Sequence, residues 1–200
     1  MNEINENKHF MIEFIPGLLL GMGLSAAVGF RIFVPFLFMS LAGKFGLMEM
    51  SAGMDWMATT PALVAFATAT IFEIGGYFIP WIDNLLDTVT TPAAFIGGTV
   101  MMSSAIIEMD PLMQWSLAII AGGGTAGLIK GGSATTRLAS TATTGGVANP
   151  LVSSVETMGA IGLSVFAVFV PALCGIIVLL LLCYTIYRLI KWRNRRKSLA

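Results

Sequence analysis

The stretch Gly122–Glu156, GGGTAGLIKGGSATTRLASTATTGGVANPLVSSVE, is polar and rich in small side chains inside an otherwise very apolar chain. If residues 133–144 form a helix, six polar side chains fall at offsets of 0, 3, 4, 7, 8 and 11 and share one face. They are Ser133, Thr136, Arg137, Ser140, Thr141 and Thr144. We therefore expect this hydroxyl stripe around one arginine to form the polar site of the protein.

Two glycine pairs bracket the stripe, Gly131-Gly132 before it and Gly145-Gly146 after it. Glycine leaves the helical conformation at little steric cost, so the pattern predicts a short helix between two breaks. In lipid, such a break is stable only where protein or a water-filled cavity satisfies the free backbone groups. We therefore predict an interrupted or re-entrant segment over residues 131–148.

The composition of the whole chain is that of an integral membrane protein. Of the 200 residues, 56% are hydrophobic and only 11% are charged, and the mean hydropathy is +0.84. Soluble domains carry about 25% charged residues. The apolar runs predict an all-α membrane domain over residues 10–190 with about five transmembrane helices, six being the alternative. An acidic tail, residues 1–9, precedes it.

Basic residues are concentrated at the carboxyl-terminal end, where residues 191–200 form a basic tail. Six of the eleven lysines and arginines lie in the last thirteen positions, at Arg188, Lys191, Arg193, Arg195, Arg196 and Lys197. Under the positive-inside rule this places the carboxyl terminus in the cytoplasm. A basic tail can also bind nucleic acid, but directly after a membrane segment we expect no nucleic-acid partner.

Histidine and cysteine are too scarce for several kinds of active site. His9 is the only histidine and lies in the terminal tail, which argues against histidine-based zinc sites and Ser-His-Asp triads. Cys174 and Cys183 are nine residues apart, so on one helix they point to opposite faces, half a turn apart around the axis, and cannot pair within it. No catalytic motif is recognisable, and we expect neither enzymatic activity, a bound metal nor a cofactor.

Charged residues within the apolar body are functional candidates, because charge is costly in lipid and normally marks a pathway or an ion pair. Arg31 and Pro35 lie in an apolar run that is too long for one upright helix, and we expect a break there. The predicted polar cavity is lined by Arg31, Glu73, Lys130, Ser133, Thr136, Arg137, Ser140, Asn149 and Glu156. Within this set we expect Arg137 to pair with Glu156 first and with Glu73 second.

Asp83 and Asp87 are weaker candidates. They lie four residues apart, so on a helix they share one face and could hold a cation or receive a basic side chain. A solvated amphipathic turn explains them equally well.

Small residues recur every four positions in two seams, one at Gly17, Gly21, Ser25 and Gly29 and one at Gly123, Gly127 and Gly131. Such seams let another helix approach closely, either within the chain or in a homodimer. Each seam is followed by an arginine and by a proline-bounded apolar segment containing one glutamate. This pattern indicates a worn two-fold internal repeat, which is typical of transporters.

Three stretches resemble an uncharacterised bacterial inner-membrane family catalogued as domain of unknown function 4126. They are GLSAAVGFRIFVPFL, YFIPWIDNLLDTVTTPAA and KGGSATTRLASTATTGGVANPLVSSVE, and the resemblance covers residues 17 to about 185. The chain departs from the family's pattern at Phe78 and Thr157, where an acid is expected, which disfavours a fully acidic cluster. The resemblance implies a compact helical domain in a bacterial inner membrane and implies no activity.

Three classes of function fit these observations. We favour a small transporter or channel, whose partners are the lipid bilayer and an unknown small solute or ion. The alternative is a non-catalytic membrane scaffold or assembly factor whose glycine seams pack partner helices. An intramembrane enzyme using Asp83 and Asp87 as acid and base is disfavoured, because no known intramembrane catalytic pattern accompanies them.

Overall fold

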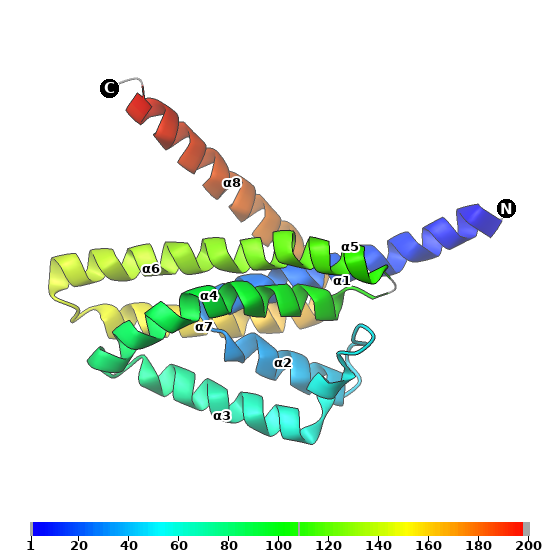
Figure 1. The fold of residues 1–200 in the computed structure, drawn as a ribbon, viewed down its shortest axis with the longest axis horizontal. Coiled ribbons are helices and arrows are strands. Elements are labelled where there is room, and N and C mark those ends of the chain that lie inside the picture. Colours follow the sequence, from blue (N-terminus) through cyan, green and yellow to red (C-terminus); the bar gives the residue numbers. More distant parts are fainter. Residues whose placement is uncertain (1, 108, 198–200) are drawn as a thin grey trace.

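The computed structural model describes residues 2–107 and 109–197, and every regular element in them is a helix (Figure 1). The elements are α1 (Asn2–Phe30), α2 (Phe33–Lys44), the 3-10 helix η1 (Asp55–Ala58), α3 (Thr60–Gly76), α4 (Pro80–Ala105), α5 (Pro111–Leu117), the π-helix η2 (Ala118–Gly123), α6 (Gly124–Thr144), α7 (Asn149–Phe169) and α8 (Pro171–Lys197). Four described segments are long and apolar enough to cross a membrane: 85–105, 111–144, 149–169 and 171–188. The all-α membrane class is therefore confirmed.

Proline determines where many of these helices begin. Proline lies in the first turn of α3, α4, α5 and α7, where its missing N–H has no helical partner to lose. The side chain of Thr59 accepts a hydrogen bond from the Ala62 N–H at the start of α3, and Asp110 caps α5 in the same way. The sequence thus sets these helix starts locally, before any tertiary contact is made.

The first apolar run forms a helical hairpin that turns back inside the bundle. Gly17 of α1 lies against Ala105 of α4, and Ser25 donates a hydrogen bond to the Gly98 carbonyl, so α1 runs antiparallel to α4. Helix α2 runs parallel to α4, since Phe36 lies against Gly97 and Met39 accepts a hydrogen bond from Ser104. The chain therefore reverses at residues 31–32, which confirms the break predicted at Arg31.

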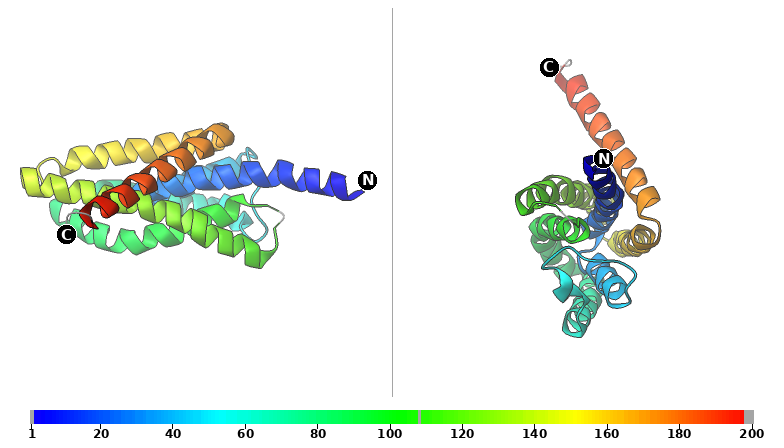
Figure 2. Two further views of the ribbon diagram at one scale, coloured as in Figure 1. Left: turned by 90° about the horizontal axis from the view of Figure 1, so that it is seen from above. Right: turned by 90° about the vertical axis from the view of Figure 1, so that its right-hand side faces the viewer.

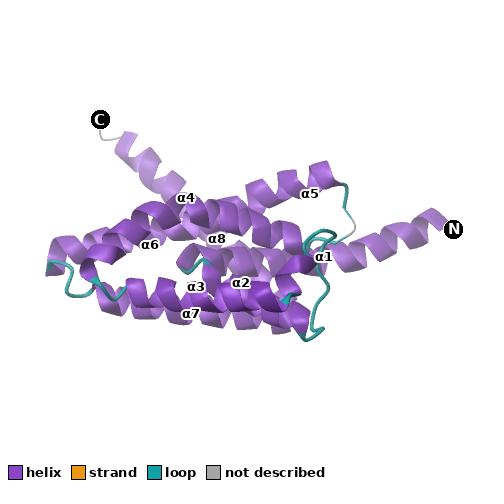
Figure 3. Cartoon of the chain, turned by 60° about the horizontal axis from the view of Figure 1, so that its bottom comes forward, coloured by secondary structure: helices purple, strands orange, loops and turns teal. Residues whose placement is uncertain are grey.

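After this hairpin, α3, α4, the α5–α6 segment and α7 each run between the two ends of the bundle (Figure 1). The loop after α2 and the loop after α4 lie at the same end (Figure 3), where the Ser51 N–H donates to the Ser104 carbonyl. The described amino-terminal and carboxyl-terminal ends of the chain lie at opposite ends (Figure 1). Helix α8 follows α7 and slants away from the bundle toward the carboxyl-terminal end (Figure 2).

The prediction of a break at Gly131-Gly132 is wrong, because α6 runs without interruption from Gly124 to Thr144. The second predicted break is present: Gly145 and Gly146 have φ of 63° and 90° and turn the chain into α7. An unbroken helix satisfies its own backbone groups, which lipid cannot do. The re-entrant feature of the fold is instead the α1–α2 hairpin.

The first glycine seam is used within the chain. A Cβ at Gly17 would lie 2.5 Å from the Ala105 carbonyl oxygen, and one at Gly29 would lie 2.8 Å from that of Ala126. The second seam is less tight, since a Cβ at Gly127 would meet only Phe95 and one at Gly131 would meet nothing within 4 Å. Homodimer formation through the seams remains a prediction, with the first seam already packed against α4 and α6.

Candidate functional site

Three basic and three acidic side chains meet inside the bundle, beside the turn of the α1–α2 hairpin. We call Arg31, Lys130, Arg137, Glu73, Asp87 and Glu156, together with Tyr77, the charged cluster. Arg31 is 0% exposed and Arg137 3%, whereas the Asp87 side chain is 23% exposed. Their formal charges cancel, which is the condition for burying so many ions together.

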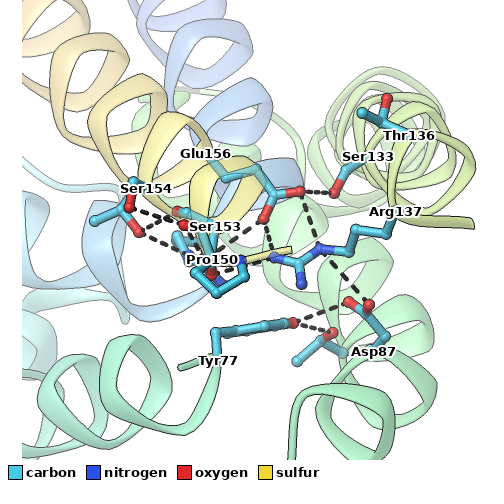
Figure 4. Close-up of polar contacts among 12 residues, drawn as sticks. Tyr77, Asp87, Ser133, Thr136, Arg137, Pro150, Ser153, Ser154 and Glu156 are labelled. Carbon is cyan, nitrogen blue, oxygen red and sulfur yellow. Dashed lines mark hydrogen bonds and ion pairs between the residues drawn. The ribbon is translucent and has the colours of Figure 1, made fainter. Parts of the chain in front are cut away.

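The pair at the centre of the cluster is Arg137 and Glu156, as the sequence predicted. The Arg137 Nη2 contacts Glu156 Oε2, and its Nε lies 3.2 Å from Oε1 (Figure 4). The two side chains form a forked contact between adjacent helices, α6 and α7. Ser133 donates to the same carboxylate, so the predicted stripe contributes one hydroxyl directly to the pair.

Arg31 approaches the same glutamate from the hairpin turn. Its Nη2 lies 3.5 Å from Glu156 Oε2, 3.0 Å from the Ser153 carbonyl oxygen and 2.5 Å from Ser153 Oγ. Its Nε donates to Thr157 Oγ1 at 3.1 Å. Glu156 therefore compensates two guanidinium groups, one from each half of the chain. Thr157, where an acid was expected, acts here as an acceptor for Arg31.

Glu73 has a different role from the one predicted. Its two carboxylate oxygens accept hydrogen bonds from the backbone N–H groups of Ile32 at 2.8 Å and Phe33 at 2.9 Å. These are unpaired donors at the start of α2, where the helix dipole also favours an anion. Glu73 therefore caps the start of α2, and the second carboxylate found near Arg137 is that of Asp87, 3.6 Å from its Nε.

Asp87 belongs to the cluster, although it was a weaker candidate. It accepts from Lys130 Nζ at 2.9 Å and from the Tyr77 hydroxyl at 3.2 Å, and it lies 3.6 Å from Arg137 Nε. Asp87 lies within helix α4, which begins at Pro80, and is not part of a solvated turn. The side chain of Asp83 lies outside the described part of the chain.

Tyr77 links the cluster and was not predicted. Its ring lies under the Arg31 guanidinium, 3.8 Å from Cζ, and under that of Arg137, 4.5 Å from Cζ. Cation–π attraction of this kind is strong when water is excluded. The Tyr77 hydroxyl also accepts from Lys130 at 3.1 Å and contacts Thr90 at 3.0 Å. An aromatic residue in an apolar run gave no signal that would distinguish it from core packing.

The remaining predicted residues lie beside the cluster rather than in it. Thr136 is exposed and donates to the Gly132 carbonyl of its own helix. Asn149 donates to Thr141, and both residues line a cavity. The Ser140 hydroxyl has no hydrogen-bond partner within the described part of the chain. The stripe is therefore divided, with Ser133 and Arg137 inside and Thr136 outside.

Two cavities approach the cluster from different sides. The polar cavity, of about 350 Å³, is lined by Asp87, Thr88, Thr91, Ala134, Arg137, Leu138, Thr141 and Asn149. The apolar groove, of about 570 Å³, is lined by Phe30, Leu128, Ile129, Gly132, Ser133, Thr136, Leu151, Val152, Val155, Glu156 and Thr185. The Arg137–Glu156 pair lies between them, since each cavity reaches one of its members.

Metal binding is not favoured by this arrangement. Among the described residues, no group of three or more histidine, cysteine, aspartate or glutamate side chains is placed to hold a metal ion. Each acid of the cluster already accepts from a basic side chain or from backbone N–H groups. Asp87 is the most exposed of the three acids.

These features define an all-α membrane protein built around a buried, formally neutral cluster of charges. The chain belongs to the family described as Domain of unknown function (DUF4126), whose model matches residues 18–191. The resemblance seen in the three sequence stretches is thereby confirmed. No curated protein and no solved structure gives a significant match to the chain.

Proposed function

We propose that the protein is a small transporter or channel that moves a hydrophilic solute or ion past the charged cluster. The observation that carries this proposal is the polar cavity of about 350 Å³ that reaches Asp87 and Arg137. Ionisable side chains at membrane depth are costly and mark solute paths more often than packing. A cavity with both signs of charge and several hydroxyls suits a small polar solute.

The α1–α2 hairpin supports the proposal. Transporters often form their sites where helices are interrupted, because free backbone groups and helix termini there can meet a solute. Here the interruption at residues 31–32 lies within the cluster, and Glu73 holds its free N–H groups. The Arg31 Nη1 is buried without an acceptor among the described residues, and water or a solute would satisfy it.

A membrane scaffold is the second candidate, favoured by the pairing within the cluster. Arg137 is almost fully buried and Glu156 is 4% exposed, so the central pair is closed in this structure. Such a cluster could serve mainly to fix the helices relative to one another. The exposed apolar side chains of Ile71 and Phe72 on α3 would then face partner helices rather than lipid alone.

We further propose that the protein lies in a bacterial inner membrane with its carboxyl terminus in the cytoplasm. The support is the basic end of α8, which follows a candidate span ending at Arg188. We also propose that the protein is not an enzyme.

Flux measurements on the purified full-length chain in proteoliposomes test the transport proposal. The probes are urea, glycine, sodium formate and potassium chloride, each followed by stopped-flow light scattering after an osmotic step. We expect at least one probe to enter faster than into protein-free vesicles. Folded, inserted protein that passes none of the four would favour the scaffold.

A matched pair of variants ties any flux to the polar cavity. Thr91 lines this cavity and Thr68 of α3 does not; both side chains are exposed and each donates to the carbonyl four residues before it. Thr91→Phe should reduce the flux strongly by filling part of the cavity, and Thr68→Phe should leave it unchanged. Equal flux through both variants would place the path elsewhere.

A further inference from the structure

The apolar groove between α6 and α7 is a second feature of the molecule, separate from the polar cavity. Its volume of about 570 Å³ lies within the range of about 300–1,000 Å³ typical of ligand sites. Both helices that form it are candidate membrane spans, and Thr185 of α8 and Phe30 of α1 border it. It therefore opens at a depth where hydrocarbon is the surrounding solvent.

The polar atoms in the groove are already engaged. Ser133 donates to Glu156, Glu156 pairs with Arg137, and Thr136 donates to the Gly132 carbonyl. Thr185 donates to the Leu181 carbonyl, and apart from Gly132 the rest of the wall is aliphatic or aromatic. Gly132 leaves part of the wall open, since a Cβ there would meet nothing within 4 Å. A polar ligand would find few unused partners, whereas a hydrocarbon chain would cover apolar surface.

The basic end of α8 identifies the headgroup. Thr185 lines the groove, and Arg188 lies three residues later, so the two share one face of the helix. Arg188 is the last residue of its candidate span, and Lys191 follows within one turn; both side chains are exposed. Basic side chains at this position attract anionic lipids, by about 1 kcal/mol for each residue near the surface.

We infer that the groove binds one anionic phospholipid, with an acyl chain between α6 and α7 and its phosphate at Arg188 and Lys191. This site is distinct from the proposed solute path, because Arg137 separates the groove from the polar cavity. The bound lipid would be a structural or regulatory ligand of the α6–α7–α8 side of the bundle.

The test measures lipid binding to the full-length chain in detergent by native mass spectrometry, titrating phosphatidylglycerol and phosphatidylcholine. We expect phosphatidylglycerol to bind about thirtyfold more tightly, because two basic residues contribute about 1 kcal/mol each. Arg188→Gln combined with Lys191→Gln should abolish this preference and leave phosphatidylcholine binding unchanged. Equal affinity of the wild type for the two lipids would overturn the proposal.

Two matched pairs of variants locate the acyl chain. Gly131 and Gly132 are adjacent, exposed and open to a Cβ, but only Gly132 lines the groove. Gly132→Leu should weaken lipid binding at least tenfold, and Gly131→Leu should not. Thr136→Phe and Thr135→Phe form the second pair, since both side chains are exposed, both donate to the carbonyl four residues before, and only Thr136 lines the groove.

Wild-type affinity in both Gly132→Leu and Thr136→Phe would refute the site. Chemical cross-linking tests whether the groove instead contacts a second copy of the chain. If Gly132→Leu lost a cross-linked dimer but kept its lipid binding, the lipid proposal would likewise be refuted. Neither result depends on solute flux. A failure here is therefore distinguishable from a failure of the transport proposal.

Discussion

Neutralising either member of the Arg137–Glu156 pair should destabilise the protein strongly. The wild-type cluster holds three basic and three acidic side chains, so Glu156→Gln leaves one excess positive charge and Arg137→Gln one excess negative charge. Breaking a buried pair by removing one partner typically costs about 3–5 kcal/mol. Both single variants should fall in this range, measured as the free energy of unfolding in mixed detergent micelles.

The structure also ranks the two variants. Without the Glu156 carboxylate, both Arg31 and Arg137 lose an anionic partner. Without Arg137, Glu156 still contacts Arg31 and Asp87 still contacts Lys130. Glu156→Gln should therefore cost more than Arg137→Gln, by about 1 kcal/mol, the magnitude of one net hydrogen bond. Restoring neutrality in the double variant should make it milder than the sum of the singles by at least about 1 kcal/mol.

A control cycle pairs Glu156→Gln with Lys44→Gln, because Lys44 is exposed and bonds to Thr60 far from the cluster. Those two changes should add within about 0.5 kcal/mol. A coupling below about 0.5 kcal/mol in the Arg137–Glu156 cycle would refute the pair. Full stability and flux in Arg137→Lys would refute the forked contact separately, since lysine cannot reproduce it.

Three further outcomes follow from other parts of the fold. Gly98→Ala should lower the melting temperature in detergent more than Gly131→Ala does. A Cβ at Gly98 would lie 2.6 Å from the Gly122 carbonyl oxygen, whereas one at Gly131 would meet nothing within 4 Å. Equal melting temperatures would contradict this. Glu73→Gln should cost about 1–3 kcal/mol by weakening two charge-assisted hydrogen bonds to α2, and unchanged proteolysis of the α1–α2 turn would count against the capping role. An alkaline phosphatase fusion after Ala200 should be inactive, and activity would reverse the proposed orientation.

The charged members of the site could be predicted because of where they stand in the sequence. Arg31, Arg137 and Glu156 interrupt apolar runs, and a buried arginine must find anions or hydroxyls since it stays protonated. Their pairing followed from charge alone. Tyr77 could not be predicted in this way, because its role depends on which guanidinium groups reach its ring, and that is decided by the packing of four helices.

The positions of the breaks show the limit of local reasoning about glycine. Gly131-Gly132 and Gly145-Gly146 look alike in sequence, yet only the second pair leaves the helical conformation. The tight contact between Gly98 and Gly122 was likewise missed, because the two glycines lie on different helices and only the fold brings them together. Glycine permits a break or a close approach, and tertiary structure selects which occurs.

The position of Glu156 links the two halves of the chain in one energetic unit. Arg31 comes from the hairpin of the first half and Arg137 from α6 of the second half, and both meet this carboxylate. If α7 moved away from α6 alone, Arg137 would lose Glu156 while Arg31 kept its contacts with Glu156, Ser153 and Thr157 of α7. If a solute opens the Arg137 side from the polar cavity, Arg31 still holds Glu156, so the cluster can lose one contact without exposing an unpaired carboxylate. In the proposed transporter, such a shared anion would let the site open on the α6 side while the side facing the hairpin stays closed.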